Sequence, residues 1–141
     1  MLAMQALCQH EVIGDSLLAQ LDEFLADESP PADVQAYARA LVTDAVDKQD
    51  EIDDAIQSVS QHWTVGRMSA VDRNTLRVAA VELLYRPDVP PRVVINEAVE
   101  IGKAFGTAET GSFINGVLDA VLKAREAKAA TSARSEAPPV G

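Results

Sequence analysis

The chain has 141 residues, which is the length of one domain and is sufficient to bury a hydrophobic core without disulfides or metals. Its formal net charge of -10 is unlike that of the basic domains that bind nucleic acids indiscriminately. The single cysteine excludes an internal disulfide, and no stretch approaches the roughly 18 apolar residues of a membrane span, so we expect a cytoplasmic protein.

The charge is distributed unevenly along the chain. Residues 1–62 contain 2 basic and 13 acidic side chains, whereas residues 63–141 contain 10 and 9. Basic groups near the phosphates supply much of the affinity for RNA. If the chain binds RNA, we expect the second half to provide the RNA-facing surface.

Helical periodicity runs along nearly the whole sequence, and no segment shows the alternation of a half-buried strand, so we expect an all-α fold. Residues 2–13 are predicted to form the end of a first helix, closed by Gly14. Its predicted inward face carries Leu2, Ala3, Ala6 and Leu7. A second helix is predicted after Asp15 and Ser16, which offer caps. Its apolar side chains are Leu17, Leu18, Leu21 and Leu25.

Pro30 and Pro31 end the second helix, and one long helical region is predicted over residues 32–62. Its many acidic side chains are interpreted as a solvated face. Trp63 follows at a junction between helices, where an indole more often anchors packing than stacks on a base. We therefore expect Trp63 to lie in the core.

Residues 69–86 are predicted to form the central helix, because they are apolar on nearly all sides. Ser69 and Asp72 have the spacing of a capping box at its start. Arg73 and Arg77 lie on its narrow polar edge, four residues apart. Arginines on a buried helix usually form ion pairs, and we expect partners among the acidic residues of the long helical region.

Two further helices are predicted, over residues 91–105 and 108–127. Gly106 is the expected stop between them. The apolar stripe of the first carries Val94, Ala98, Ile101 and Phe105, and that of the second carries Phe113, Val117 and Val121. Residues 128–141 have no apolar period and are expected to be disordered. The chain is thus predicted to be one domain, residues 1–127, followed by a tail.

Residues suited to catalysis are few. Cys8 and His10 lie two positions apart on a helix and so do not share a face. The glycines form no phosphate-binding loop, and no cysteine or histidine cluster has the spacing of a zinc site. Asn96, Glu97 and Glu100 come from one helix and are interpreted as exposed or capping residues. The sequence predicts no catalytic residue, no metal site and no cofactor.

The C-terminal half of NusB-type proteins resembles two stretches of this chain, RMSAVDRNTLRVAAVELLYRPDVPPRVVINEAVEIGKAFG (residues 67–106) and FINGVLDAV (residues 113–121). The opening AMQALCQ (residues 3–9) is similar to the family's first helix, so the resemblance covers about residues 3–123. It implies an all-helical fold of two packed helical subdomains, and a role in transcription antitermination that involves no enzyme activity.

The resemblance also implies partners. NusB proteins bind the boxA element of nascent ribosomal transcripts, a single-stranded RNA, together with NusE, a small-subunit ribosomal protein. The pair then joins an antitermination complex with RNA polymerase. Some members form homodimers that hide the RNA-binding surface, and the sequence leaves monomer and homodimer open.

The resemblance implies which residues contact the partners, one matched position at a time. Gln5, Thr110 and Phe113 match positions on the RNA-facing side, whereas Cys8 and Asp72 match positions on the NusE side. We interpret other motif residues as structural. Asn96 and Asn115 are expected to be buried amides that tie helix ends together, and Gly116 is expected to permit a close approach of helices.

The chain departs from the family at its start, where NusB proteins carry an arginine-rich run that contacts RNA phosphates. Either the chain begins downstream of the true start, or its RNA binding has faded. The second explanation defines the alternative function, a helical protein-interaction module without RNA binding. A NusB-like domain cut from an RNA methyltransferase is a third interpretation, which the chain length disfavours.

Overall fold

The computed structural model describes residues 1–60 and 63–136, and every regular element in these ranges is a helix. The all-α prediction is therefore confirmed. The elements are α1 (Leu2–Ile13), α2 (Ser16–Ala19), α3 (Leu21–Ala26), α4 (Ala32–Asp47), α5 (Gln49–Val59), the 3₁₀ turn η1 (Val65–Arg67), α6 (Ala70–Tyr85), α7 (Pro91–Phe105) and α8 (Ala108–Glu136).

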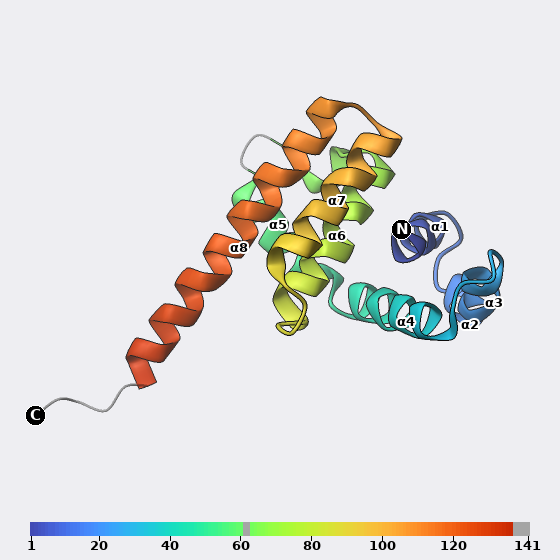
Figure 1. The fold of residues 1–141 in the computed structure, drawn as a ribbon, viewed down its shortest axis with the longest axis horizontal. Helices are drawn as coiled ribbons and strands as arrows, with labels where there is room; N and C mark the ends of the chain where they lie inside the picture. Colours follow the sequence, from blue (N-terminus) through green and yellow to red (C-terminus); the bar gives the residue numbers. More distant parts are fainter. Residues whose placement is uncertain (61–62, 137–141) are drawn as a thin grey trace, which may run out of the picture.

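Helix α6 is the centre of the fold, as predicted. It packs against α1, α4, α5, α7 and α8. Figure 1 shows α1 to α4 on one side of it, while α5, α7 and α8 lie on the other. These are the two packed helical subdomains. One continuous hydrophobic core joins them, and its fully buried side chains include Leu25, Ile52, Leu76, Ile95, Ile114 and Leu118.

Three predicted helix ends are confirmed by backbone geometry. Gly14 follows α1 with a φ of 72°, a left-handed conformation that glycine adopts without steric cost. The Ser69 hydroxyl accepts a hydrogen bond from the Asp72 backbone N–H at 3.1 Å and so caps α6. Gly106 directly follows α7.

Two predicted helices are divided in the structure. The predicted second helix bends at Gln20, between α2 and α3. The long region bends at Lys48, between α4 and α5, because α4 packs on α1, α3 and α6 whereas α5 packs on α6 and α8. A straight helix cannot place its apolar stripe on both sets of neighbours. Residues 61–62, also predicted to be helical, lie outside the described residues.

The last helix is longer than predicted, since α8 continues to Glu136 into the segment expected to be disordered. Its far part extends beyond the other helices (Figure 1). Residues 124–130 read AREAKAA, and alanine, arginine, lysine and glutamate are strong helix formers. Extending an existing helix also avoids the unfavourable nucleation step. Residues 137–141 lie outside the described residues.

The close approach of helices occurs at a different glycine from the one predicted. Gly116 is exposed, and a Cβ atom on it would meet nothing within 4 Å. A Cβ atom on Gly102 would instead lie 2.5 Å from Ile114 Cδ1, so Gly102 is the position where α7 and α8 require glycine. Asn96 and Asn115 are also exposed, and the prediction that they are buried amides is wrong. Both fall on the outer faces of α7 and α8.

Candidate RNA and partner interface

Cys8 on α1 is half-buried against the start of α6. Its Sγ lies 3.5 Å from the Ala70 carbonyl oxygen, and the Asn74 side-chain amide donates to Sγ at 3.5 Å. Desolvation by burial raises the pKa of the Cys8 thiol. A thiol that stays protonated is a poor nucleophile, so Cys8 joins α1 to α6 instead of acting as a reactive group.

Both arginines of α6 form ion pairs, as predicted, but only Arg77 has a partner in the long helical region, since Arg73 pairs with Glu11 of α1. Arg77 binds Asp53 of α5 through two nitrogen–oxygen contacts of 2.8 Å. Glu11 of α1 accepts from both arginines, with Arg73 at 2.7 Å and Arg77 at 2.9 Å. The hydrogen bond from Arg73 is the main cause that lowers the pKa of Glu11. Because these guanidinium groups are occupied inside the protein, they are not free to contact phosphates.

Arg73 also holds the turn that precedes α6. Its Nη1 donates to the Met68 carbonyl oxygen at 2.6 Å and to the Val65 carbonyl oxygen at 3.4 Å. The arginine therefore fixes the 3₁₀ turn relative to α1 and α6. A rigid turn at this place presents the residues before it in one orientation.

Asp72 lies in the first turn of α6, within two residues of the carbonyl that Cys8 contacts. Its side chain is partly exposed, and its carboxylate forms no ion pair among the described residues. A carboxylate in the first turn is stabilised by the helix dipole. The two residues predicted to face NusE thus come together at the N-terminal end of α6.

Phe113 and Trp63 form an aromatic pair that the sequence did not predict. Their ring centroids are 5.5 Å apart with an interplanar angle of 63°. Phe113 is half-buried, but Trp63 is 61% exposed, so the prediction that Trp63 lies in the core is wrong. The exposed pair offers the π surface that single-stranded nucleic acids use for stacking.

Gln57 of α5 holds the backbone on either side of Trp63. Its side-chain nitrogen donates to the carbonyl oxygens of Ser60 at 3.3 Å and Trp63 at 3.1 Å, and its side-chain oxygen accepts from the Val65 backbone N–H at 2.9 Å. One amide therefore satisfies three backbone groups of the chain that leaves α5. An exposed glutamine in an acidic helix gave no sequence signal for this role.

Thr110 and Gln5, the other predicted RNA-facing residues, lie in different surroundings. The Thr110 hydroxyl accepts from the Thr107 backbone N–H at 3.2 Å and so stabilises the first turn of α8, one turn before Phe113. Gln5 lines a hollow of about 450 Å³ between α1 and the α2–α3 pair, which includes Gln9 and Gln20. Phe105, predicted to lie on the inner stripe of α7, is 51% exposed because α7 ends there.

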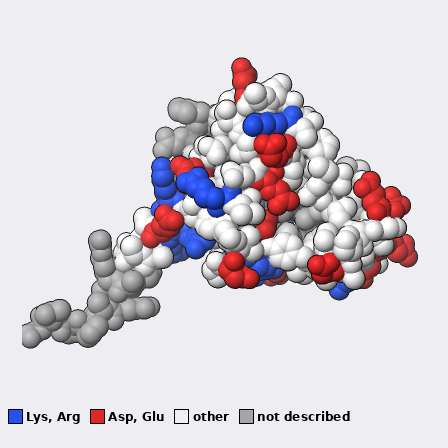
Figure 2. All heavy atoms as spheres, in the orientation of Figure 1, with Lys and Arg blue, Asp and Glu red and all other residues white. Residues whose placement is uncertain are grey.

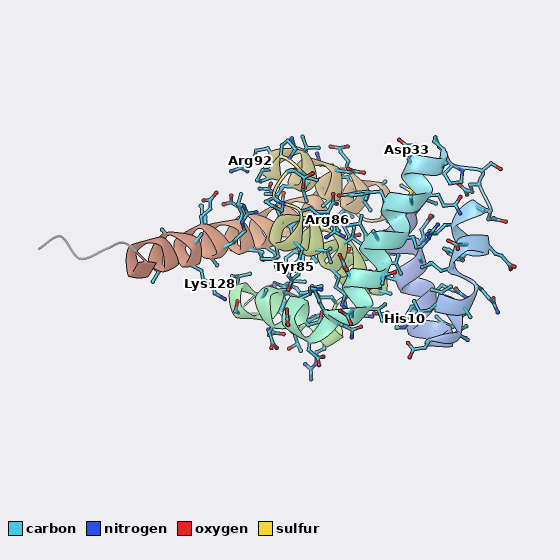
Figure 3. The ribbon with its side chains drawn as sticks, turned by 90° about the horizontal axis from the view of Figure 1, so that it is seen from below. His10, Asp33, Tyr85, Arg86, Arg92 and Lys128 are labelled. Carbon is cyan, nitrogen blue, oxygen red and sulfur yellow. The ribbon has the colours of Figure 1, made fainter. Side chains whose placement is uncertain are left out.

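The C-terminal end of α6 is tied to α4 and α5. Arg86 forms an ion pair with Asp44, and the Tyr85 hydroxyl donates to Glu51 at 2.6 Å. Figure 3 shows Tyr85 and Arg86 near the middle of the molecule, between Lys128 on one side and His10 and Asp33 on the other. These contacts occupy polar groups internally, and they place this end in a structural role.

Charge is divided over the surface as it is over the sequence. Figure 2 shows acidic side chains gathered over the part formed by α2 to α4, and basic side chains where α8 leaves the other helices. Arg67, in the turn after Trp63, is exposed and has no ion-pair partner among the described residues. Its guanidinium is therefore available for a phosphate. Across these residues there is no group of three or more potential metal ligands, and no helix is long and apolar enough to cross a membrane.

Comparison with known proteins points to one family. A family model described as the NusB family matches residues 1–123. The transcription antitermination protein NusB of Desulfatibacillum aliphaticivorans is 48% identical over 120 residues, which cover 85% of this chain and 84% of that protein. The T. maritima NusB structure has a TM-score of 0.78 and 39% identity, covering 86% of each chain. A crystal structure of the antitermination factors NusB and NusE with dsRNA matches at a TM-score of 0.77 and 30% identity, covering 87% of this chain and 92% of that one.

Proposed function

This chain belongs to the NusB family, and from that premise we propose that it is a transcription antitermination factor. It binds boxA-like single-stranded RNA of nascent ribosomal transcripts together with the ribosomal protein NusE. The proposed activity is assembly of a complex, and it requires no catalytic residue, metal or cofactor. Its place of action is the cytoplasm, where transcripts are made.

The observation that carries this proposal is the similarity to a NusB solved with NusE and dsRNA. That similarity extends over 87% of this chain. The family model covers residues 1–123, which include the aromatic pair and the start of α6. The surface of this chain is suited to the same partners. It has an exposed aromatic pair at Trp63 and Phe113 and a free cation at Arg67 within the described part of the chain.

We assign the partners to neighbouring parts of this surface. Thr110 and Phe113 at the start of α8, with Gln5 on α1, are proposed to face RNA. Cys8 and Asp72, which meet at the start of α6, are proposed to face NusE. Helices α1 and α8, which carry these residues, both pack against α6, the helix that carries Asp72.

The net charge of -10 predicts that RNA binding depends on NusE. An acidic protein repels the phosphate backbone at long range, and few described cations are free of internal partners. NusE would add positive charge and a second surface along the same RNA. The NusE pair is further proposed to join RNA polymerase, and a homodimer is proposed as a resting form that covers the RNA-binding surface.

Fluorescence anisotropy tests the function directly. A labelled boxA-like RNA is titrated with this chain, with NusE, and with both, over a range of salt concentrations. We expect tight binding only with both proteins, and an affinity that falls as salt rises. A stable pair with NusE that never binds RNA would contradict the proposal, and would identify the chain as an interaction module instead.

A further inference from the structure

A shallow depression of about 250 Å³ lies beside the aromatic pair. It is formed where α5 ends, where the chain enters η1, and where the second turn of α8 passes. Its lining residues are Val59, Ser60, Trp63, Ser112, Phe113, Gly116 and Val117. We call it the Trp63 pocket.

The wall of the pocket is pre-organised. The carbonyl groups of Ser60 and Trp63 both accept from the Gln57 side chain, and Phe113 contacts the indole edge-on. The indole is nevertheless 61% exposed, so much of its surface is left for a ligand. A rigid aromatic side chain loses little conformational entropy when a ligand stacks on it.

One residue of the pocket lining, Ser60, has an unsatisfied polar atom directly beneath the surface. Ser60 is only 4% exposed, and its Oγ has no hydrogen-bond partner in the described structure. Burying a hydroxyl without a partner is unfavourable, and such groups are rare in folded proteins. Gly116, on the opposite side, leaves open space where a side chain would otherwise project.

We propose that the Trp63 pocket binds one unstacked base of the RNA, with its ring stacked on Trp63 and its polar edge hydrogen-bonded to Ser60 Oγ. This inference rests on the proposed function, since it names a contact within the RNA-facing surface. A base fits because it combines a flat π face with donors and acceptors on its edge. A hydroxyl can both donate and accept, so Ser60 suits several bases.

Two other ligands fit the pocket less well. An apolar side chain of a partner protein would cover Ser60 Oγ and leave it unpaired, which costs affinity. A phosphate would need a cation, and the pocket lining contains no lysine or arginine. Arg67, four residues after Trp63, is exposed and lies outside the pocket lining, so it does not supply that cation to the pocket itself.

The first test measures binding of a fluorescein-labelled boxA-like RNA to the complex of the full chain with NusE. Trp63→Ala is expected to lower the affinity about 10- to 100-fold, the range found when one stacked base loses its aromatic partner. Trp63→Phe keeps a ring and is expected to retain most of the affinity. Tyr37→Ala, which removes an exposed aromatic ring from α4, is the matched control and should bind RNA normally.

Two variants separate binding from folding. Ser60→Ala removes the unpaired hydroxyl and should leave the melting temperature unchanged or higher, while RNA affinity falls about fivefold through loss of one hydrogen bond. Gly116→Leu should fold normally, because the space is open, but its side chain occupies the pocket and should also weaken RNA binding. If the substituted residue had only a structural role, its substitution would lower both the melting temperature and the RNA affinity.

Abasic substitution along the RNA then identifies the base. At one position, removal of the base and Trp63→Ala should each lower affinity, and the two together should lower it no further. Unchanged RNA affinity in Trp63→Ala, with a wild-type complex that binds, would overturn this inference alone. A wild-type complex that does not bind RNA would refute the proposed function. Weaker binding of NusE to Trp63→Ala without RNA would overturn the base site and assign the pocket to the partner protein.

Discussion

Arg77 and Asp53 form a two-pronged ion pair that joins the central helix α6 to α5, with both nitrogen–oxygen distances at 2.8 Å. Arg77 is only 7% exposed, and it also donates to Glu11 of α1. This one guanidinium therefore connects both helical subdomains. Glu11 also accepts from Arg73, which donates to the carbonyl oxygens of Val65 and Met68, so the ion pairs of Arg77 are linked through Glu11 to the turn before α6.

Removing the Arg77 guanidinium should lower the stability of the fold. Arg77→Ala leaves Asp53 and Glu11 without their buried partner, and we expect the free energy of unfolding to fall by about 3 kcal/mol. Urea unfolding followed by circular dichroism measures the change. The matched control is Arg39→Ala, whose pair with Asp22 is exposed on both sides and should contribute less than about 1 kcal/mol. Equal losses in the two variants would show that the Arg77 network is no more than a surface pair.

The same network predicts a dependence of stability on pH. The pKa of Glu11 is lowered in the folded protein, chiefly by the hydrogen bond from Arg73. A lowered pKa stabilises the fold above the unfolded-state value of 4.5, and this contribution is lost as pH falls through the folded-state pKa. Glu11→Gln should therefore differ most from the wild type near neutral pH, and the two curves should converge in acid. Unfolding free energies measured from neutral pH to about pH 3 test this, and a constant difference would contradict it.

A pair of glycine substitutions tests the packing of α7 against α8. A Cβ atom at Gly102 would lie 2.5 Å from Ile114 Cδ1, and Ile114 is fully buried, so its side chain must shift within the packed core. We expect Gly102→Ala to destabilise the protein by about 1 kcal/mol, because overpacking exceeds the gain in helix propensity. Gly116→Ala is the control in open space and should stabilise the protein by up to about 1 kcal/mol. Thermal unfolding of both variants should give shifts of opposite sign.

The sequence predicted the fold where local chemistry and burial agree. Such features depend only on neighbouring residues, and three of them are present in the structure: the cap at Ser69, the left-handed glycine at Gly14 and the apolar surface of residues 69–86. The bend at Lys48 could not be predicted in this way, since it depends on which neighbours α4 and α5 meet. Cys8, which the family resemblance assigned to the partner side with Asp72, contacts Ala70, two residues before Asp72 in the first turn of α6.

The candidate site was harder to predict than the fold. The backbone around Trp63 is held by Gln57, two residues before the end of α5, whose side chain satisfies three backbone groups beyond the helix. Nothing in the periodicity distinguishes Gln57 from other polar residues of α5. Asn115 and Gly116 were misassigned for a related reason: a motif identifies residues that matter to a family, but not the side of the helix on which they lie.

Asp72 provides the clearest test of the proposed partner surface. Its backbone N–H caps α6 through Ser69, so substitution of the side chain leaves that hydrogen bond in place. Asp72→Lys reverses a partly exposed charge beside Cys8, and we expect the affinity for NusE to fall about tenfold or more, since like charges at an interface are costly. Isothermal titration calorimetry with purified NusE measures this, and far-ultraviolet circular dichroism should show unchanged helical content.

The control for Asp72→Lys must also replace an aspartate in the first turn of a helix, so that both variants lose the same favourable interaction with a helix dipole. Asp33 meets this need, because it is exposed and lies in the first turn of α4, near the far end of the molecule (Figure 3). Asp33→Lys loses a similar interaction with a helix dipole and changes the net charge by the same amount. If only Asp72→Lys weakens the complex with NusE, the loss of affinity comes from a contact at the start of α6. If both variants weaken it equally, NusE responds to the overall negative charge of the chain, and Asp72 is not part of a specific site.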